Sequence, residues 1–282
     1  MGYPLNDIIP GLDLQNIIEI LLAFFLTSIR LSAFIIASPF FSARFIMLRV
    51  RIIIAFVISI IVFSIHPLEL DTKILTSAYG IAIIFKEVAI GVTAGLILSI
   101  MFSAASLAGE KIATSAGLSY AAQIDPVSGV QTPVVSQILY LFLIMIFLTV
   151  DGHLIALRII IESYQLIPIG TLPVPSALID GGMAASGSMF LNASVIMLPV
   201  VLVVLLINVA IGIITRSAPQ LNLFSFGFPI TMLGTFIILY FSIGNLGFAF
   251  SDLIDSSLDH LMTTIESLKT VSYTHLTLPT KA

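Results

Sequence analysis

Long hydrophobic runs dominate the chain and predict helices that cross a membrane. They cover about residues 17–37, 52–65, 74–107, 132–150, 183–214 and 228–250. Several reach the roughly 20 residues that a helix needs to span the hydrocarbon core of a bilayer. Strands of a membrane barrel would alternate apolar and polar residues, and these runs do not. We therefore expect an all-α integral membrane protein with about six long, partly kinked hydrophobic helices.

The composition supports a membrane protein and excludes several kinds of chemistry. The chain is 59% hydrophobic and 9% charged, whereas soluble domains have about 25% charged residues. It contains no cysteine, which excludes disulfides, thiolate metal sites and thiol nucleophiles. The net charge of −4 comes without a basic stripe, so nothing indicates nucleic acid binding. The four histidines are isolated, and no cofactor is expected.

The charges also predict a topology and a division of the chain. Arg44, Arg49 and Arg51 form the densest basic cluster, and the positive-inside rule places it in the cytoplasm. Six crossings then leave both termini outside. We expect a polar tail at 1–14, one membrane domain at 15–255, an acidic segment at 256–270 and a non-native tail at 271–282. The first residues carry Asp7 and no Lys or Arg, so no cleavable signal peptide is expected.

Two of the hydrophobic runs are longer than one crossing needs. The runs at 74–107 and 183–214 both exceed that length, and the second contains Pro199. A proline inside a helix predicts a kink at that point. We therefore do not expect every run to be a simple straight crossing.

A polar, bendable stretch interrupts the apolar pattern between Ala108 and Gln137. It carries charged and amide side chains together with several glycines and prolines, so it cannot form one uninterrupted helix. Backbone of this kind is tolerated beside membrane helices only where it is buried in protein or lines a water-filled path. We interpret this stretch as the functional segment of the chain.

Charged side chains within the hydrophobic runs need partners. Arg30 either reaches toward the membrane interface or meets a carboxylate in an assembly. Lys86 and Glu87 are adjacent in sequence, so they do not share a helix face and each is expected to meet a different neighbour. Gly91 and Gly95 form a GxxxG pattern, which lets helices approach closely. The contact is either within the chain or with another subunit.

Two patterns in the sequence approach those of known activities. The segment 117–121 approaches a GxSxG nucleophile motif but lacks the second glycine. The candidate base His153 would lie about 30 Å away across a spanning helix, so a serine hydrolase is not expected. Arg30, Lys86, Glu87 and Glu110 could form an ion path, but no inverted repeat indicates a stand-alone transporter. No phosphate-binding loop is present, and we expect no enzymatic activity.

The order of motifs along the chain resembles a known family. The motifs include Ala108-Gly109-Glu110, Gly117-Leu118-Ser119, Asp125-Pro126, Pro133-Val134, Ser136-Gln137, Gly152-His153-Leu154, Pro168-Ile169-Gly170 and Ala218-Pro219-Gln220-Leu221-Asn222. Together with Arg30 and Pro39-Phe40, and with Glu87, Gly91 and Gly95, they cover about residues 15–255. This arrangement resembles the FliR family of flagellar biosynthesis proteins. The related subunit of virulence type III secretion systems has the same architecture and remains the first alternative. A stand-alone ion or solute transporter is the second.

The resemblance implies a non-enzymatic subunit of the flagellar protein export gate. Such subunits form hairpins in a helical assembly with FliP and FliQ, to which FlhB and FlhA attach, and flagellar proteins are the exported substrates. The implied location is the bacterial inner membrane at the flagellar basal body. The implied plug residues are Gly109, Glu110, Gly117, Leu118, Tyr120, Asp125, Pro126, Gly129, Gln131 and Pro133. The implied subunit contacts are Arg30, Lys86, Glu87, Gly91, Gly95, Gln137, Arg216, Pro219, Gln220 and Asn222.

Overall fold

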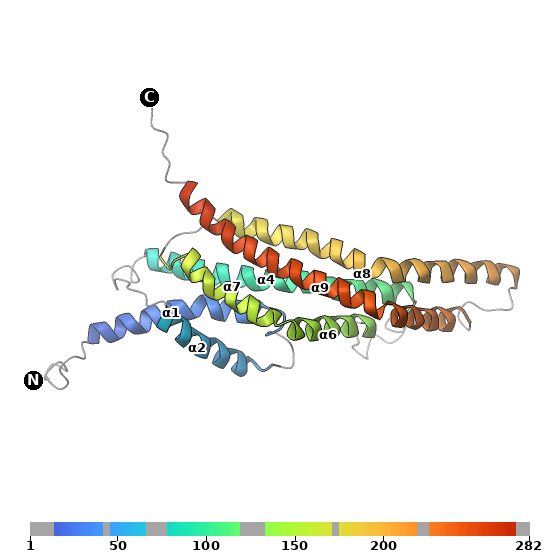
Figure 1. Cartoon of the computed structure of the whole chain (residues 1–282), viewed down its shortest axis with the longest axis horizontal. Coiled ribbons are helices and arrows are strands. Elements are labelled where there is room, and N and C mark those ends of the chain that lie inside the picture. The colour runs from blue at the N-terminus through green and yellow to red at the C-terminus, as the bar shows by residue number, and fades with distance from the viewer. Residues whose placement is uncertain are drawn as a thin grey trace, which may run out of the picture. The chain divides into compact units, whose positions relative to one another are not determined.

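All regular secondary structure in the described part of the chain is helical. The computed structural model describes residues 14–41, 46–65, 78–118, 133–170, 175–218 and 226–274. Within these ranges it contains seven helices and no strand (Figure 1). They are α1 (Leu14–Ala37), α2 (Leu48–Ile65), α4 (Ala78–Ser115), α6 (Val134–Thr149), α7 (Gly152–Leu166), α8 (Pro175–Ser217) and α9 (Phe228–Thr274). The all-α prediction is therefore confirmed.

Three helices are much longer than the bilayer is thick. α4 has 38 residues, α8 has 43 and α9 has 47. At 1.5 Å per residue, these lengths correspond to about 57, 65 and 70 Å, against about 30 Å for the hydrocarbon core. Among the described residues, five helices are long and apolar enough to cross a membrane, or six if α6 and α7 form one broken span. The length of a helix therefore does not mark where it leaves the bilayer.

Two helix ends differ from the expected boundaries. The third hydrophobic run was expected to end near residue 107, but α4 continues to Ser115. The sixth was expected to end near residue 250, but α9 continues through the acidic segment to Thr274. Hydropathy falls at both points because polar residues begin there. A helix does not end where it becomes polar unless a breaking residue or a cap stops it.

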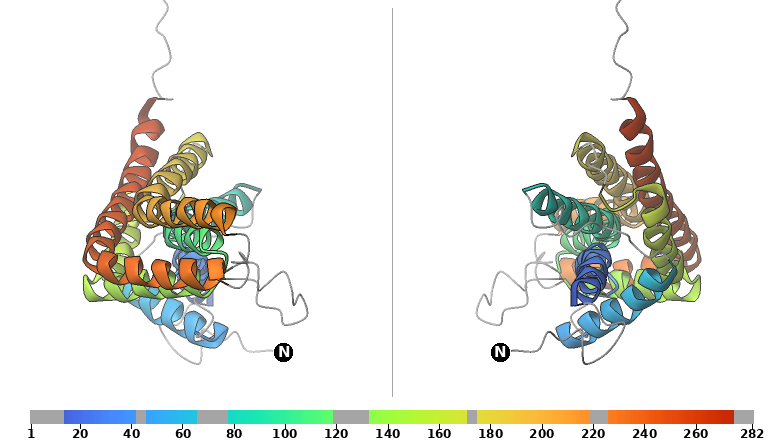
Figure 2. Two further views of the ribbon diagram at one scale, coloured as in Figure 1. Left: turned by 90° about the vertical axis from the view of Figure 1, so that its right-hand side faces the viewer. Right: turned by 90° about the vertical axis from the view of Figure 1, so that its left-hand side faces the viewer.

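The chain divides into two compact units, and the first contains the N-terminal helices. It comprises residues 1–99, 154–183 and 260–282. α1 and α2 pack side by side, as Figures 1 and 2 show. Phe24 of α1 contacts Phe56 and Phe63 of α2 edge to face. The core of this unit joins α1, α2, α4 and α7 through five buried side chains: Leu26, Val62, Ile83, Tyr164 and Ile169.

Two glycines bring α1 and α4 into close contact within the first unit. A methyl group added at Gly91 would overlap the carbonyl oxygen of Arg30, and one added at Gly95 would lie 2.6 Å from Cβ of Ala37. Ser99, one turn further along α4, donates a 2.7 Å hydrogen bond to the carbonyl of Ala37. Small residues at this spacing allow backbones to approach without side chains between them. The GxxxG pattern is therefore used in a contact inside the chain.

The second unit contains the middle of the chain and most of the two longest helices. It comprises residues 100–153 and 184–259. Its core includes two edge-to-face aromatic pairs, Phe102 with Phe147 and Phe142 with Phe250. Through these pairs α4 packs against α6, and α6 packs against α9. Pro199 lies within helix α8, where it removes one backbone hydrogen bond.

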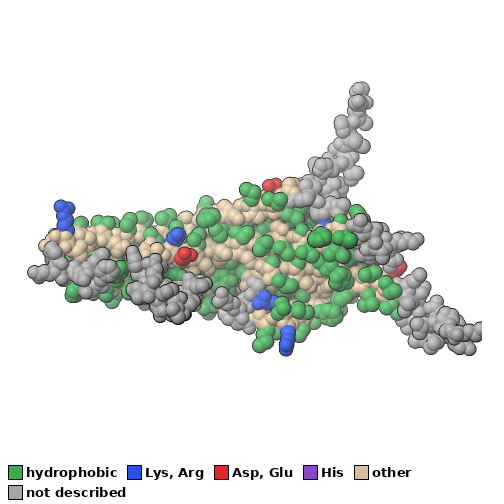
Figure 3. All heavy atoms as spheres, turned by 180° about the vertical axis from the view of Figure 1, so that it is seen from behind, with side chains coloured by type: hydrophobic (Ala, Val, Ile, Leu, Met, Phe, Trp, Pro, Cys, Tyr) green, Lys and Arg blue, Asp and Glu red, His purple; other side chains and the backbone are tan. Residues whose placement is uncertain are grey.

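Apolar side chains also cover much of the molecular surface. On the face shown in Figure 3, hydrophobic side chains are spread widely and charged side chains are few. Phe85, Tyr240, Phe241 and Phe248 are each more than 70% exposed. Contiguous apolar surface of this extent marks contact with lipid or with other proteins. This surface agrees with the membrane class that the composition predicts.

Candidate functional site

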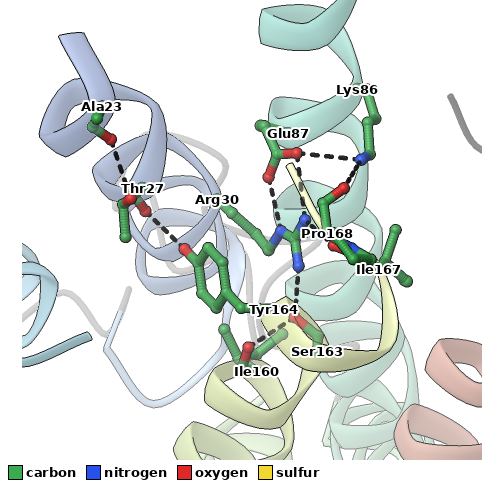
Figure 4. Close-up of polar contacts among 10 residues, drawn as sticks. All are labelled: Ala23, Thr27, Arg30, Lys86, Glu87, Ile160, Ser163, Tyr164, Ile167 and Pro168. Carbon is green, nitrogen blue, oxygen red and sulfur yellow. Dashed lines mark hydrogen bonds and ion pairs between the residues drawn. The ribbon is translucent and has the colours of Figure 1, made fainter. Parts of the chain in front are cut away.

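A buried ion pair joins α1 to α4 at the centre of the first unit. Arg30 Nε lies 2.7 Å from Glu87 Oε2, and Arg30 Nη2 lies 3.1 Å from Glu87 Oε1. Both side chains are completely buried. The geometry is the two-pronged match between a guanidinium and a carboxylate (Figure 4). Arg30 and Glu87 therefore find their charge partners within the chain, and an ion pair between subunits is not needed to explain their burial.

Lys86 brings a second cation to the same carboxylate. Its ammonium donates a 2.9 Å hydrogen bond to the carbonyl of Pro168 and lies 3.4 Å from Glu87 Oε1. Lys86 and Glu87 were expected to meet different neighbours, and their shortest contacts, to Pro168 and Arg30, are indeed different. The additional contact between the two arises because the flexible four-carbon stem of lysine can bend back over the helix.

Three donors, two of them partners of Glu87, bind backbone carbonyls of the residues that follow α7. Arg30 Nη2 donates to the carbonyl of Ile167 at 2.9 Å, next to the bond from Lys86 to Pro168. The Tyr79 hydroxyl donates to the carbonyl of Gly170 at 2.6 Å. These carbonyls belong to residues after Leu166, the last residue of α7, and backbone carbonyls outside a helix or sheet need donors from elsewhere. Arg30, Lys86 and Tyr79 supply them, and we name residues 167–170 with these three donors the carbonyl clamp.

Two polar residues on α7 complete the cluster. Ser163 accepts a 2.9 Å hydrogen bond from Arg30 Nη1. The ring of Tyr164 lies 4.3 Å from the guanidinium carbon, and its hydroxyl donates to the carbonyl of Thr27 at 2.6 Å. Sequence reasoning assigned no role to Tyr79, Ser163 or Tyr164. The sequence did contain one signal for Ser163 and Tyr164. Both lie in a largely apolar stretch, and polar groups that become buried require hydrogen-bond partners.

The contacts of this cluster hold helices together. It contains one carboxylate, two cations and hydroxyl donors, and the contacts described above all join groups of the same unit. No group of three or more His, Cys, Asp or Glu that could hold a metal occurs among the described residues. The cluster fixes α7 against α1 and α4, which are far from it in sequence.

In the second unit, a glycine ends α4 immediately before the segment 119–132. Gly117 has a φ of 78°, a left-handed conformation that favours glycine. Leu118 N donates to the carbonyl of Ala113 and Gly117 N to that of Thr114, at 2.9 and 3.1 Å. This pair of bonds defines a Schellman motif, which stops a helix and turns the chain away from its axis. The polar segment therefore leaves α4 at a fixed point.

Replacement of Gly117 tests this helix end. Gly117→Val is expected to lower stability by about 1–2 kcal/mol because valine must adopt a left-handed conformation. Gly117→Asn is expected to cost less, since asparagine tolerates that conformation. SDS titration of the detergent-solubilised protein measures both changes. Equal stability of the two variants would contradict the role given to the φ of Gly117.

A second glycine holds α4 against the start of α6. A methyl group at Gly109 would overlap the backbone at Ser136, and the Ser136 hydroxyl donates a 2.9 Å hydrogen bond to the carbonyl of Ser106. The family resemblance implied that Gly109 is a plug residue. It instead lies within α4, six residues before Ser115, where its missing side chain permits the close crossing. Residues 108–115 thus belong to the support and not to the loop.

The other predicted site residues have varied positions. Glu110 is exposed on α4, Gln137 on α6 and Arg216 near the end of α8. Pro133 occupies the N-cap position of α6. Asn208, which was not a predicted site residue, donates a 3.2 Å hydrogen bond to the carbonyl of Ser115. Eight predicted residues lie outside the described ranges: Tyr120, Asp125, Pro126, Gly129, Gln131, Pro219, Gln220 and Asn222.

The fold and these contacts define a class: multi-pass helical membrane proteins whose intramembrane charges are paired within the chain. The family model for bacterial export proteins, family 1, matches residues 21–257. The chain belongs to this family.

Three similar proteins illustrate the family. The flagellar biosynthetic protein FliR of Pectobacterium carotovorum subsp. carotovorum is 36% identical over 209 residues, covering 74% of this chain and 79% of the relative. FliR of Bacillus subtilis (strain 168) is 33% identical over 234 residues, covering 80% and 88%. The surface presentation of antigens protein SpaR of Shigella sonnei is 28% identical over 223 residues, covering 76% and 84%.

Proposed function

We propose that this protein is a non-enzymatic subunit of the flagellar type III protein export gate in the bacterial inner membrane, at the flagellar basal body. The observation that carries this proposal is the family match across residues 21–257. Relatives of 36% and 33% identity are flagellar biosynthetic proteins, which favours the flagellar system. The exported substrates are flagellar proteins. The partners are the subunits FliP, FliQ, FlhB and FlhA.

The segment 119–132 closes the channel in this proposal. Its support consists of the Schellman motif at Gly117 and the close crossing of Gly109 with Ser136. These contacts fix the two helix ends from which the segment departs. A segment of small, glycine- and proline-containing backbone can be displaced by a passing chain without breaking a helix. Leu118 and Tyr120 supply apolar bulk to fill the lumen.

Removal of residues 119–131 tests the plug. The deletion leaves α4, its C-terminal cap and Pro133 intact, and it is expected to raise ion conductance several-fold in vesicles that carry the assembled gate. Co-purification of the partner subunits establishes that the variant still assembles. Wild-type conductance in a fully assembled variant would refute the assignment of the plug.

A virulence secretion subunit is the second candidate, because SpaR of Shigella sonnei is 28% identical over 223 residues. The two candidates predict different phenotypes in the native host. Loss of the gene should abolish flagellar filaments and swimming if the protein serves the flagellum. Normal swimming together with lost effector secretion would instead favour the virulence system.

A further inference from the structure

The side-chain amide of Asn208 joins α8 to the last residue of α4, entirely within the second unit. Asn208 Nδ2 donates a 3.2 Å hydrogen bond to the carbonyl oxygen of Ser115, which is 93 residues away in sequence. Ser115 is the final residue of α4. The Schellman motif satisfies the carbonyls of Ala113 and Thr114 and leaves that of Ser115 to another donor. The end of α4 is therefore held both by its own cap and by a second helix.

Asn208 is the one polar side chain in a long apolar part of α8. Between Val195 and Ile214 every other residue is apolar. Val204 lies four residues before Asn208 and Ile211 three residues after it, and both are buried. This spacing places the three side chains on one face of the helix. A polar group within an apolar membrane helix is costly without a partner and marks a functional position.

A second asparagine of α8 shows what such an amide does without a partner on another helix. Asn192 Nδ2 donates a 2.9 Å hydrogen bond to the carbonyl of Ser188, one turn back in the same helix. Local bonding of this kind is open to any asparagine in a helix. Asn208 instead bonds to α4. Local satisfaction of the amide therefore does not explain Asn208, whereas a link between two helices does.

The strength of this hydrogen bond suits a contact that both holds and releases. Asn208 is exposed and Ser115 is half-buried, so breaking the bond leaves no polar atom sealed in the core. Hydrogen bonds between membrane helices shift an equilibrium by about threefold on average and by about 20-fold at most. The contact is therefore strong enough to bias the position of a helix end and weak enough to break during transport.

We propose that Asn208 is a positioning residue of the export gate, whose amide biases the end of α4 toward its orientation in the closed channel. Release of the Ser115 carbonyl then permits this helix end to turn when a substrate passes. The inference rests on the proposed function, because the segment assigned there to the plug follows this helix end. It adds a side chain of α8 that controls closure from outside that segment.

Ion conductance of the resting, assembled gate tests this role. Asn208→Leu keeps the size of the side chain but removes the donor, and it is expected to raise conductance about threefold, the average effect of such a bond. Asn208→Gln retains a carboxamide that can reach the same carbonyl, so its conductance should be close to that of the wild type. Asn192→Leu is the matched control, because its amide bonds within its own helix, and it should leave conductance unchanged.

A double variant shows whether Asn208 acts through the plug. Combined with removal of residues 119–131, Asn208→Leu should add no further conductance, since two changes that act through one element are not additive. A further threefold rise in that background would overturn the inference. So would an equal rise in Asn192→Leu, or wild-type conductance in an assembled Asn208→Leu gate. In each of these cases the proposed function would stand.

Hydrogen exchange of the purified full chain gives a second measurement that does not depend on assembly. The amides of Gly117 and Leu118 donate the hydrogen bonds of the cap. They should exchange about threefold faster in Asn208→Leu than in the wild type, and at the wild-type rate in Asn192→Leu. Unchanged exchange in Asn208→Leu would overturn the inference alone. Wild-type conductance after removal of residues 119–131 would instead refute the plug, and the inference with it.

Discussion

Glu87→Gln is expected to destabilise the membrane domain by about 3–5 kcal/mol, the usual cost of leaving a buried charge without its partner. Glu87 accepts contacts from Arg30 at 2.7 and 3.1 Å and from Lys86 at 3.4 Å. Without its negative charge, two buried cations face each other. SDS titration in detergent measures the change. A stability equal to that of the wild type would show that the ion pair does not hold α1 to α4.

Two comparisons isolate the effect of burial. Arg30→Met should cost less than Glu87→Gln, because Lys86 remains beside the carboxylate. Arg158→Met removes an ion pair with the same 2.7 Å distance. That pair is exposed, with side-chain exposures of 77% and 45%, and exposed pairs contribute little because water and salt screen them. No measurable loss of stability is expected there.

Gly91→Ala is expected to destabilise the contact between α1 and α4 by about 1–3 kcal/mol, the range for overpacked positions. Its methyl group would overlap the carbonyl oxygen of Arg30 and lie 2.8 Å from Cβ of Ala33. The two helices must then separate. Because Gly91 lies one turn after Glu87 on α4, that separation also lengthens the ion pair.

Gly187→Ala is the control for Gly91→Ala, and the expected change in stability has the opposite sign. Gly187 lies within α8, and an added methyl group would meet nothing within 4 Å. Alanine favours the helix over glycine by about 0.5–1 kcal/mol, so this variant should be as stable as the wild type or more stable. Thermal unfolding of the two purified variants tests the contrast. A loss in Gly187→Ala as large as that in Gly91→Ala would contradict the packing explanation, because helix propensity favours alanine at both positions.

Much of the fold could be predicted from the hydrophobic runs. Their continuity indicated helices, their number indicated about six, and the run at 132–150 indicated the position of α6. The ends of α4 and α9 could not be predicted from hydropathy. α4 ends at Ser115 because Gly117 adopts a left-handed conformation, and a neighbouring candidate such as Gly109 does not. Sequence composition alone does not distinguish a capping glycine from a packing glycine.

The candidate site was only partly predictable for a similar reason. Arg30 and Glu87 stand out because charges are rare in apolar runs, so the need for partners could be predicted. The identity of the partners could not, since Arg30 and Glu87 are 57 residues apart and Arg30 and Ser163 are 133 apart. The acceptors at Ile167 and Pro168 are backbone carbonyls. Every residue has a carbonyl, so no side-chain pattern could identify them.

The carbonyl clamp also sets an order of events during synthesis. Lys86 and its acceptor Pro168 are separated by 82 residues, and ribosomes add about 5–20 residues per second. The growing chain therefore carries Lys86 for roughly 4–16 s before Pro168 is made. Arg30 and Glu87 can pair during that interval, so the α1–α4 pair forms a template onto which the end of α7 docks when it emerges.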